Sequence, residues 1–324
     1  MALQQRFIVG TGRCGSTLLS RMLDLHPQVV CLHEFFTGLD WGQRFQAGTV
    51  PNPVLVNCLT AEQPVTTEVL ARGYTTEEIC YPFGAPHARR QMGDKLPWLL
   101  ISMLSRLSPD PDSLFEDFVG MLRSLPADTL QSLYPQIFTW LARQGGGQVW
   151  IERSGSSVDY LADLVAMFPG ARFLHIHRDG REAALSIRAH PFYRLGVALL
   201  YGLFPAGCSD AEMIDYALQT PPPLEAVGKY WSDQVVNGHQ ASRHLPRDRY
   251  RETCFELLVA EPAAQLEAIC DFFQLDVPAG FLQQAVSLSR GVPPLRRDKL
   301  TRDELDVLNR ACAPGMALLG QAAV

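Results

Sequence analysis

The chain has 324 residues, of which 47% are hydrophobic and 19% charged, and its formal net charge is −6. This composition is typical of a folded globular protein and argues against the basic surface that non-specific nucleic-acid binding requires, so we expect no nucleic-acid partner. Eight scattered cysteines, with no CxxC pair and no zinc-type spacing, predict a reducing, cytoplasmic location without a metal site. The longest apolar stretch, Leu195–Cys208, is too short to span a membrane, and we expect neither a signal peptide nor a transmembrane segment.

A glycine-rich loop between a strand and a helix is the strongest motif of the chain. The apolar run Phe7–Val9 predicts a buried strand, and the apolar spacing from Leu18 to Leu25 predicts a helix, with GTGRCGST (Gly10–Thr17) between them. Such a loop wraps its backbone N–H groups around an anion, and the helix N-terminus adds partial positive charge. Because the loop also contains the Arg13 guanidinium, it predicts a site for a phosphate-like group.

The loop differs from that of the nucleoside triphosphatases. Their pattern, G-x-x-x-x-G-K-[ST], has the glycine spacing of Gly10 and Gly15 but requires a lysine where this chain has Ser16. A triphosphate bound with magnesium would lack that lysine, so a less charged donor without a metal fits better. A tight turn in which the glycines serve geometry alone is the alternative interpretation.

Two ionisable residues follow the next expected strand, Val29–Leu32. His33 and Glu34 come directly after it, at the edge where open α/β sheets bind their ligands. Either side chain can take a proton from an acceptor hydroxyl. For His33 a buried, hydrogen-bonded histidine is the favoured alternative. For Glu34 the alternatives are a helix-cap neighbour or a salt-bridge partner, but its position favours a functional role.

Residues from about 38 to 144 show little strand pattern. Turns and helical segments, among them Trp98–Leu107 and Ser113–Leu125, predict a helical insertion on the sheet rather than a separate domain. The apolar stripe of the first segment is more typical of a core-facing helix than of an acceptor pocket. We therefore expect a single domain over residues 1–324, with the insertion contributing the acceptor side.

The α/β pattern returns after Gly145–Gly147. Strands are expected at Gln148–Ile151, Arg172–His177 and Tyr250–Phe255, and helices at about Val158–Phe168, around Ala183–Ile187, within Pro221–Arg243, at Ala263–Phe273 and from about Arg302. Three arginines stand where these strands end, namely Arg153, Arg178 and Arg181. They predict a second anion subsite at the edge that holds Arg13.

In these segments the chain resembles the sulfotransferase family that uses 3′-phosphoadenosine 5′-phosphosulfate, and its bacterial-type members in particular. GTGRCGSTLL (Gly10–Leu19) is similar to the family's 5′-phosphosulfate loop, and FLHIHRDGREAALS (Phe173–Ser186) is similar to its 3′-phosphate motif. Weaker similarities are FPGARF (Phe168–Phe173) and FELLVAEP (Phe255–Pro262). Together these segments cover most of the chain outside the insertion.

The resemblance implies a role for each matching residue. Arg13 stands where the family has a loop Lys or Arg that polarises the sulfuryl and bridging oxygens, and Arg178 and Ser186 match the pair that binds the 3′-phosphate. The eight-residue spacing of that pair is about two helical turns. The residues implied in donor binding are Arg13, Cys14, Gly15, Ser16, Thr17, Leu18, Arg178 and Ser186.

The chain departs from the family pattern at the general base. Animal cytosolic members carry Lys-Thr-His before the 3′-phosphate motif, whereas the corresponding stretch here, Glu152–Gly155, has no histidine. Bacterial members carry a Glu after the second strand in a context that LHEFF (Leu32–Phe36) resembles. Glu34 is therefore the expected base, with His33 as the alternative and Arg13 as the cation of the reaction. The family's RKGxxGDW tail motif is not cleanly present, and only Arg290, Arg296 and Arg297 are candidates for it.

The expected fold class is α/β, with a P-loop-type parallel sheet flanked by helices and a helical insertion over the active-site edge. The resemblance implies transfer of a sulfuryl group from 3′-phosphoadenosine 5′-phosphosulfate to a hydroxyl of a small-molecule, lipid or glycolipid acceptor, without a metal, leaving adenosine 3′,5′-bisphosphate. A P-loop nucleotide or small-molecule kinase and a non-catalytic nucleotide-binding module are the rival interpretations. The sequence leaves the acceptor's identity and a homodimer open.

Overall fold

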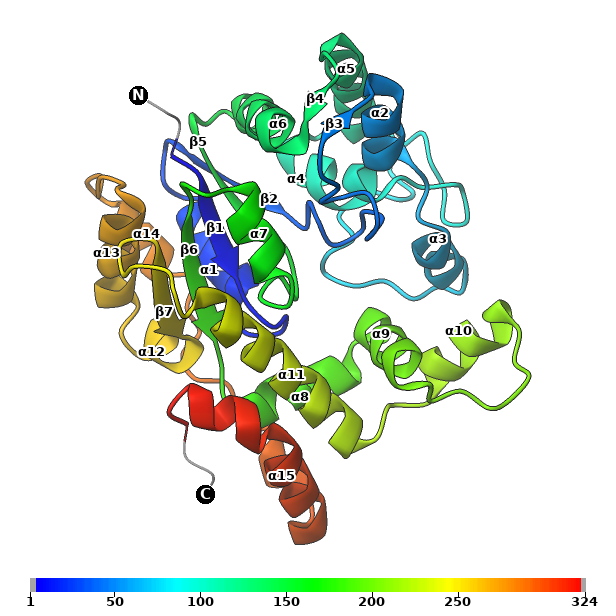
Figure 1. Ribbon diagram of the computed structural model, residues 1–324, viewed down its shortest axis with the longest axis vertical. Helices are drawn as coiled ribbons and strands as arrows, with labels where there is room; N and C mark the ends of the chain where they lie inside the picture. The colour runs from blue at the N-terminus through cyan, green and yellow to red at the C-terminus, as the bar shows by residue number, and fades with distance from the viewer. Residues whose placement is uncertain (1–3, 322–324) are drawn as a thin grey trace. The chain divides into compact units, whose positions relative to one another are not determined.

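A parallel sheet forms the centre of the fold. The computed structural model describes residues 4–321, and within them five strands lie in the order β2-β5-β1-β6-β7, flanked by helices (Figure 1). The strands are β1 (Arg6–Val9), β2 (Val29–His33), β5 (Val149–Arg153), β6 (Arg172–His177) and β7 (Tyr250–Cys254). β1, β2, β5 and β6 are short, mostly buried runs, as strands covered on both faces require, whereas β7 is polar and partly exposed. The α/β class and the five strands expected from the sequence are confirmed.

The described chain divides into two compact units. One contains residues 4–7, 26–154 and 166–171, and the other contains residues 8–25, 155–165 and 172–321. In the first unit β2 and β5 pair in parallel, with His33 opposite Arg153. The helices of the first unit are α2 (Asn52–Thr60), α3 (Pro64–Ala71), η1 (Leu100–Leu104), α4 (Ser105–Leu107), α5 (Pro111–Ser124) and α6 (Leu130–Gln144).

The insertion of the first unit is mainly helical, as expected, with two local differences. β3 (Thr49–Val50) pairs antiparallel with β4 (Asp128–Thr129), in a ladder too short to leave an alternating pattern in the sequence. The helix expected at Trp98–Leu107 begins as a π-helix, η1. There the Ser105 hydroxyl donates to the Leu100 carbonyl at 2.6 Å, which replaces part of the regular backbone ladder.

An aromatic cluster forms the core of the first unit. Phe138 packs edge-on against Phe35 and Trp150, with ring centroids 4.8 and 4.9 Å apart. Tyr134 stacks on Phe138 and donates its hydroxyl to the Arg44 carbonyl at 2.6 Å. These rings have at most 1% of their surface exposed, so they supply much of the apolar burial of this unit.

The second unit is built on β6 and β7, which pair in parallel from Phe173 opposite Tyr250 to His177 opposite Cys254. Its helices include α1 (Ser16–Leu23), which follows β1 through the glycine-rich loop, and α8 (Gly180–Ala189), which follows β6. The remaining helices that lie in it are α9 (Pro191–Tyr201), α10 (Asp210–Gln219), α11 (Leu224–Ser242), α12 (Phe255–Ala260), α13 (Pro262–Phe273), α14 (Phe281–Val286), η2 (Arg297–Lys299) and α15 (Arg302–Leu318), and α7 spans Leu161–Met167.

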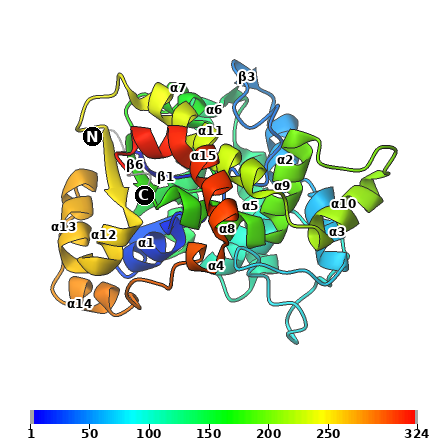
Figure 2. The same ribbon diagram turned by 90° about the horizontal axis from the view of Figure 1, so that it is seen from below.

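Close packing of α11 against α15 organises the core of the second unit (Figure 2). Gly228 and Gly315 allow the approach, because a Cβ at Gly228 would lie 2.7 Å from the Ala311 Cβ. The Gly315 N–H donates to the Ser232 hydroxyl at 2.9 Å across the two helices. Trp231 fills the space between them and α8 and is fully buried.

The other helices expected from the sequence are present, with ends shifted by a few residues. The clearest shift is at α7, which begins at Leu161 rather than near Val158. The α-helices that were not expected individually from the sequence are α2, α3, α6, α9, α10, α12 and α14. Within residues 4–321, no helix combines the length and the apolar character needed to cross a lipid bilayer.

Replacing Phe138 by alanine should destabilise the protein by about 3–5 kcal/mol, because the variant leaves a cavity inside the aromatic cluster. The measurement is chemical unfolding followed by tryptophan fluorescence. Met92→Ala is the control, since Met92 is 45% exposed and its loss should change stability by about 0.5 kcal/mol or less. Equal effects of the two substitutions would contradict the assigned core.

Candidate active site

The glycine-rich loop of the second unit connects β1 to α1. Gly15 is the N-cap of α1 and has φ 95°, a left-handed conformation that favours glycine. A Cβ on Gly15 would overlap the ring of Phe255, the first residue of α12. The start of a helix after a glycine-rich loop is the geometry of an anion cradle, because backbone N–H groups point out of the first turn. Ser16 and Cys14 are buried there, and Thr17 and Leu18 are half-buried.

Arg13 holds a strained position in this loop. Its φ of 54° places a non-glycine residue in the left-handed region, which costs about 1–3 kcal/mol and is frequent at functional sites. Its Nε donates a hydrogen bond of 3.2 Å to the Ser186 hydroxyl, which lies on α8 and is buried. The structure thus brings together two of the residues that the sequence predicts to bind one donor.

Arg178 follows β6 directly and is a half-buried cation. Its side chain is 12% exposed, and its guanidinium lies 4.8 Å from the centroid of the Phe255 ring. The Glu182 carboxylate is 3.9 Å away, and within residues 4–321 the buried Nε has no hydrogen-bond partner. Burial lowers the pKa of the Arg178 guanidinium, although an arginine keeps its charge in a protein. A half-buried cation with a buried, unsatisfied donor is suited to bind an anion.

Phe255 connects the glycine-rich loop of the second unit to Arg178. Its ring contacts Gly15 of the loop and lies against the Arg178 guanidinium. The sequence pointed to this segment only as a weak family similarity. Phe255 directly follows a strand of the sheet, and this position is what could have placed it at the ligand-binding edge from the sequence.

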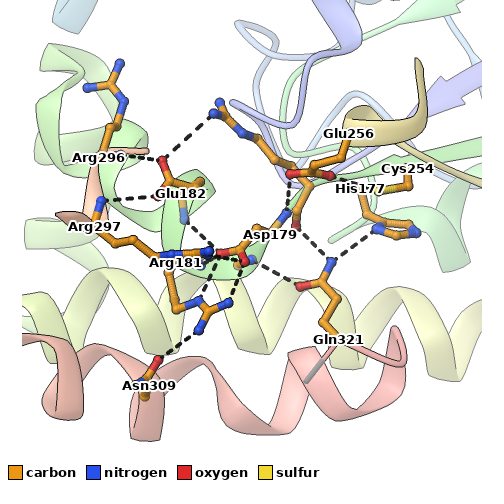
Figure 3. A network of polar contacts seen from close by, with 12 residues as sticks. His177, Asp179, Arg181, Glu182, Cys254, Glu256, Arg296, Arg297, Asn309 and Gln321 are labelled. Carbon is orange, nitrogen blue, oxygen red and sulfur yellow. Dashed lines mark hydrogen bonds and ion pairs between the residues drawn. The ribbon is translucent and has the colours of Figure 1, made fainter. Parts of the chain in front are cut away.

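A polar network holds the turn that carries Arg178 (Figure 3). The Gln321 side chain spans this turn, because its amide nitrogen donates to the Arg178 carbonyl at 3.1 Å and its amide oxygen accepts from the Gly180 N–H at 3.2 Å. The buried Glu182 carboxylate accepts from the backbone N–H groups of Arg296 and Arg297 at 2.9 and 3.2 Å. The segments that precede and follow α15 therefore fix the position of the turn that carries Arg178.

The arginines that the sequence placed at one anion-binding edge separate into distinct environments. Arg181 forms an ion pair of 2.6 Å with Asp179 and contacts Asn309, so its guanidinium serves the network of Figure 3. Arg297 binds the same Asp179 carboxylate at 2.6 Å. Asp179 also caps α8 by accepting from the Arg181 N–H.

Glu34 lies in the first unit, in a buried ion pair with Arg153. Both side chains are 4% exposed, and the Glu34 carboxylate also accepts a hydrogen bond from the Thr37 hydroxyl. The Glu34 backbone has φ 58°, with its N–H donating to the Arg153 carbonyl at 2.8 Å and its carbonyl accepting from Trp98 Nε1 at 2.6 Å. The salt-bridge alternative considered for Glu34 is therefore observed, together with a strained backbone. An ion pair of this kind favours the ionised carboxylate, the form that accepts a proton.

The other ionisable residues of this region are also buried. His33 is 3% exposed at the end of β2. Glu152 is fully buried on β5 and accepts a hydrogen bond from the Ser154 hydroxyl. In the part of the chain between residues 4 and 321, no group of three or more His, Cys, Asp or Glu side chains is arranged to hold a metal ion.

Removing one partner of the buried Glu34–Arg153 ion pair should destabilise the folded protein. Glu34→Gln leaves the Arg153 charge buried, so we expect a loss of about 3–5 kcal/mol in the free energy of unfolding. The double variant Glu34→Gln/Arg153→Met should lose less than the two single variants together, as measured by denaturant unfolding. Glu116→Gln breaks the exposed pair with Arg89 and should cost about 1 kcal/mol or less. Strict additivity of the two buried substitutions would contradict the pairing.

Glu152 should give the protein a pH-dependent stability. Burial raises the pKa of this carboxyl to about 8 from the unfolded value of 4.5, whereas the Ser154 hydrogen bond and the Arg44 charge act in the opposite direction. Its contribution is therefore complete below about pH 4.5 and is lost as the pH rises through about 8. Unfolding measured across this window should show a fall in stability that Glu152→Gln reduces. The same pH profile in both proteins would contradict the assignment.

Comparison with known proteins places the fold and the family. The solved structure of the sulfotransferase domain from the curacin biosynthetic pathway is similar, with 15% identity, a TM-score of 0.50 and 99% of each chain covered. The sulfotransferase STF9 from Mycobacterium avium matches with 15% identity and a TM-score of 0.47, over 99% of this chain and 78% of that one. Mouse sulfotransferase SULT7A1, solved in complex with PAP, matches with 9% identity and a TM-score of 0.41, over 98% and 89%.

A search of curated protein sequences finds no match. A model of the sulfotransferase family matches residues 6–98 and 116–279, which is most of the chain and includes the glycine-rich loop, Glu34, Arg178 and Ser186. The chain belongs to the sulfotransferase family, and it is a transferase.

Proposed function

We propose that this protein transfers a sulfuryl group from 3′-phosphoadenosine 5′-phosphosulfate to the hydroxyl group of a small-molecule, lipid or glycolipid acceptor. The observation that carries the proposal is Arg178, whose half-buried guanidinium shares the Phe255 ring with the glycine-rich loop and whose buried Nε has no hydrogen-bond partner among residues 4–321. A donor with two separate phosphate groups would engage both elements, one at the loop and one at Arg178. Family membership supports this donor over ATP.

The chain's own residues fit such a donor. The loop residues Cys14 to Leu18 would hold the 5′-phosphate through backbone N–H groups and the hydroxyls of Ser16 and Thr17. Arg178 and Ser186 would hold the 3′-phosphate, with Arg178 supplying the charge. Arg13 would link the two proposed phosphate sites. It belongs to the loop, and its Nε donates a hydrogen bond to the hydroxyl of Ser186.

The reaction needs charge stabilisation and one proton transfer. Transfer forms a sulfur–oxygen bond to the acceptor hydroxyl, leaves the electron pair of the broken bond on the phosphate of adenosine 3′,5′-bisphosphate, and releases one proton. Arg13 and the loop N–H groups would stabilise the negative charge that develops, which is usually the largest catalytic contribution. Glu34 would accept the proton on its ionised carboxylate, with His33 as the alternative base.

The single-domain arrangement over residues 1–324 stays a prediction, and so does the role of the insertion in acceptor binding. The candidate base lies in the first unit, and the residues proposed to bind the donor lie in the second. No observation favours the kinase alternative, and family membership argues against it.

Glu34→Gln should lower the turnover number about 10²–10⁴-fold and leave the affinity for adenosine 3′,5′-bisphosphate unchanged, because the base acts on the acceptor. The assay follows transfer of labelled sulfuryl groups from the donor to a panel of hydroxylated metabolites and lipids. Circular dichroism at the assay temperature must show that the variant is folded, and Glu116→Gln serves as the control in the same unit.

Unchanged turnover in folded Glu34→Gln would move the base to His33. Failure of the wild-type protein to transfer to any acceptor while it binds the donor would favour the non-catalytic binding module. Failure to bind the donor would overturn the proposed function itself.

A further inference from the structure

A group of hydroxyls lies against the glycine-rich loop of the second unit. Ser156 Oγ is 3.4 Å from the Tyr193 hydroxyl oxygen and 3.5 Å from the Tyr230 hydroxyl oxygen. The same Oγ is 3.4 Å from the carbonyl oxygen of Thr11. These side chains come from α9, from α11 and from the segment after β5, so the fold assembles them from three separate parts of the chain.

Gly12 makes room for the Tyr193 hydroxyl. A Cβ on Gly12 would overlap both the hydroxyl oxygen and the ring of Tyr193, and the backbone there has φ 73°. The hydroxyl therefore lies directly on the loop backbone. Arg13, the loop's cation, is the next residue in the chain, and its Nε donates to the Ser186 hydroxyl at 3.2 Å.

Neighbouring groups hold this hydroxyl in place. Ser156 has φ 55°, the same strained left-handed conformation as Arg13 and Glu34, and this conformation brings its Oγ to Tyr193. Burial raises the pKa of Tyr230, which keeps that phenol protonated and able to donate within the group. The Tyr193 ring also packs edge-on against His190, at 5.1 Å between centroids. A phenol fixed in this way costs little reorganisation when charge develops beside it.

We propose that Tyr193 is a further catalytic residue, whose hydroxyl donates a hydrogen bond to the sulfuryl oxygens of the donor next to Arg13, with Ser156 and Tyr230 as its positioning residues. The proposal rests on the proposed function, since it requires a sulfuryl group at the loop. Tyr193 keeps its proton throughout; it stabilises charge and does not act as a base. Its contribution should be larger in the transition state, where the sulfuryl oxygens carry more negative charge.

The test compares two ligands that differ only in the sulfuryl group. In Tyr193→Phe the ring that packs on Gly12 is kept and the hydroxyl is lost. We expect the affinity for 3′-phosphoadenosine 5′-phosphosulfate to fall about tenfold and the affinity for adenosine 3′,5′-bisphosphate to stay unchanged. The turnover number should fall about 10²-fold, the loss typical of one missing donor at a developing oxyanion.

Tyr201→Phe is the matched control, because Tyr201 lies on the same helix and its hydroxyl donates to the Asp233 carboxylate at 3.2 Å. It should leave both affinities and turnover unchanged. Ser156→Ala provides a second variant should Tyr193→Phe fold poorly, and it should show the same selective loss at a smaller size.

The outcomes separate this inference from the function on which it rests. Equal weakening of both ligands in Tyr193→Phe would assign the residue to packing alone and overturn the inference. Unchanged donor affinity and turnover would overturn it as well. If the wild-type protein binds neither ligand, the proposed function fails, whatever Tyr193 does.

Discussion

The contact between the Phe255 ring, the backbone of Gly15 and the Arg178 guanidinium is the constraint on which the donor half of the site depends. Because the ring fills the space where a Gly15 side chain would lie, any larger residue there must displace it. Displacing the ring would also move the surface on which Arg178 rests. The backbone of Arg178 is also fixed, because its carbonyl accepts a hydrogen bond from the side-chain amide of Gln321, the last residue that the structure describes. The glycine-rich loop and Arg178, which we propose to bind the two phosphates, are therefore positioned by one packing arrangement rather than by two independent loops.

Three residues of the proposed site have strained backbones, and a fourth non-glycine residue with positive φ, Gln274, caps the C-terminus of α13. Arg13, Glu34 and Ser156 all adopt positive φ without being glycine, and each follows shortly after a strand of the sheet. Such conformations persist only where the surroundings enforce them, at about 1–3 kcal/mol each. The enforcing contacts are visible for Glu34, whose N–H and C=O are both hydrogen-bonded and whose carboxylate is paired with Arg153. Local strain here coincides with the residues to which the proposed reaction assigns charge stabilisation, proton transfer and positioning.

Local patterns predicted the strands of the sheet and the positions of Arg13 and Arg178 after them, but not the partners of the site residues. The strand ends at Val9 and His177 could be read from apolar runs, which placed Arg13 and Arg178 on one expected edge. The partners lie far away in sequence: Gln321 is 143 residues from Arg178, and Arg153 is 119 residues from Glu34. No periodicity encodes such contacts. A residue's position after a strand also did not determine its partner. Arg181 was expected in an anion subsite, but its guanidinium forms an ion pair with Asp179, two residues earlier in the chain.

Calorimetric titration tests the central claim most directly, that the loop and Arg178 bind the two phosphates of one donor. Adenosine 3′,5′-bisphosphate should bind more tightly than adenosine 5′-phosphate by about 10- to 100-fold, the effect of a charge-assisted contact to the 3′-phosphate. Arg178→Ala should remove that difference and leave the binding of adenosine 5′-phosphate unchanged. Equal affinity of the wild-type protein for the two nucleotides, or tighter binding of ATP with magnesium, would contradict the account.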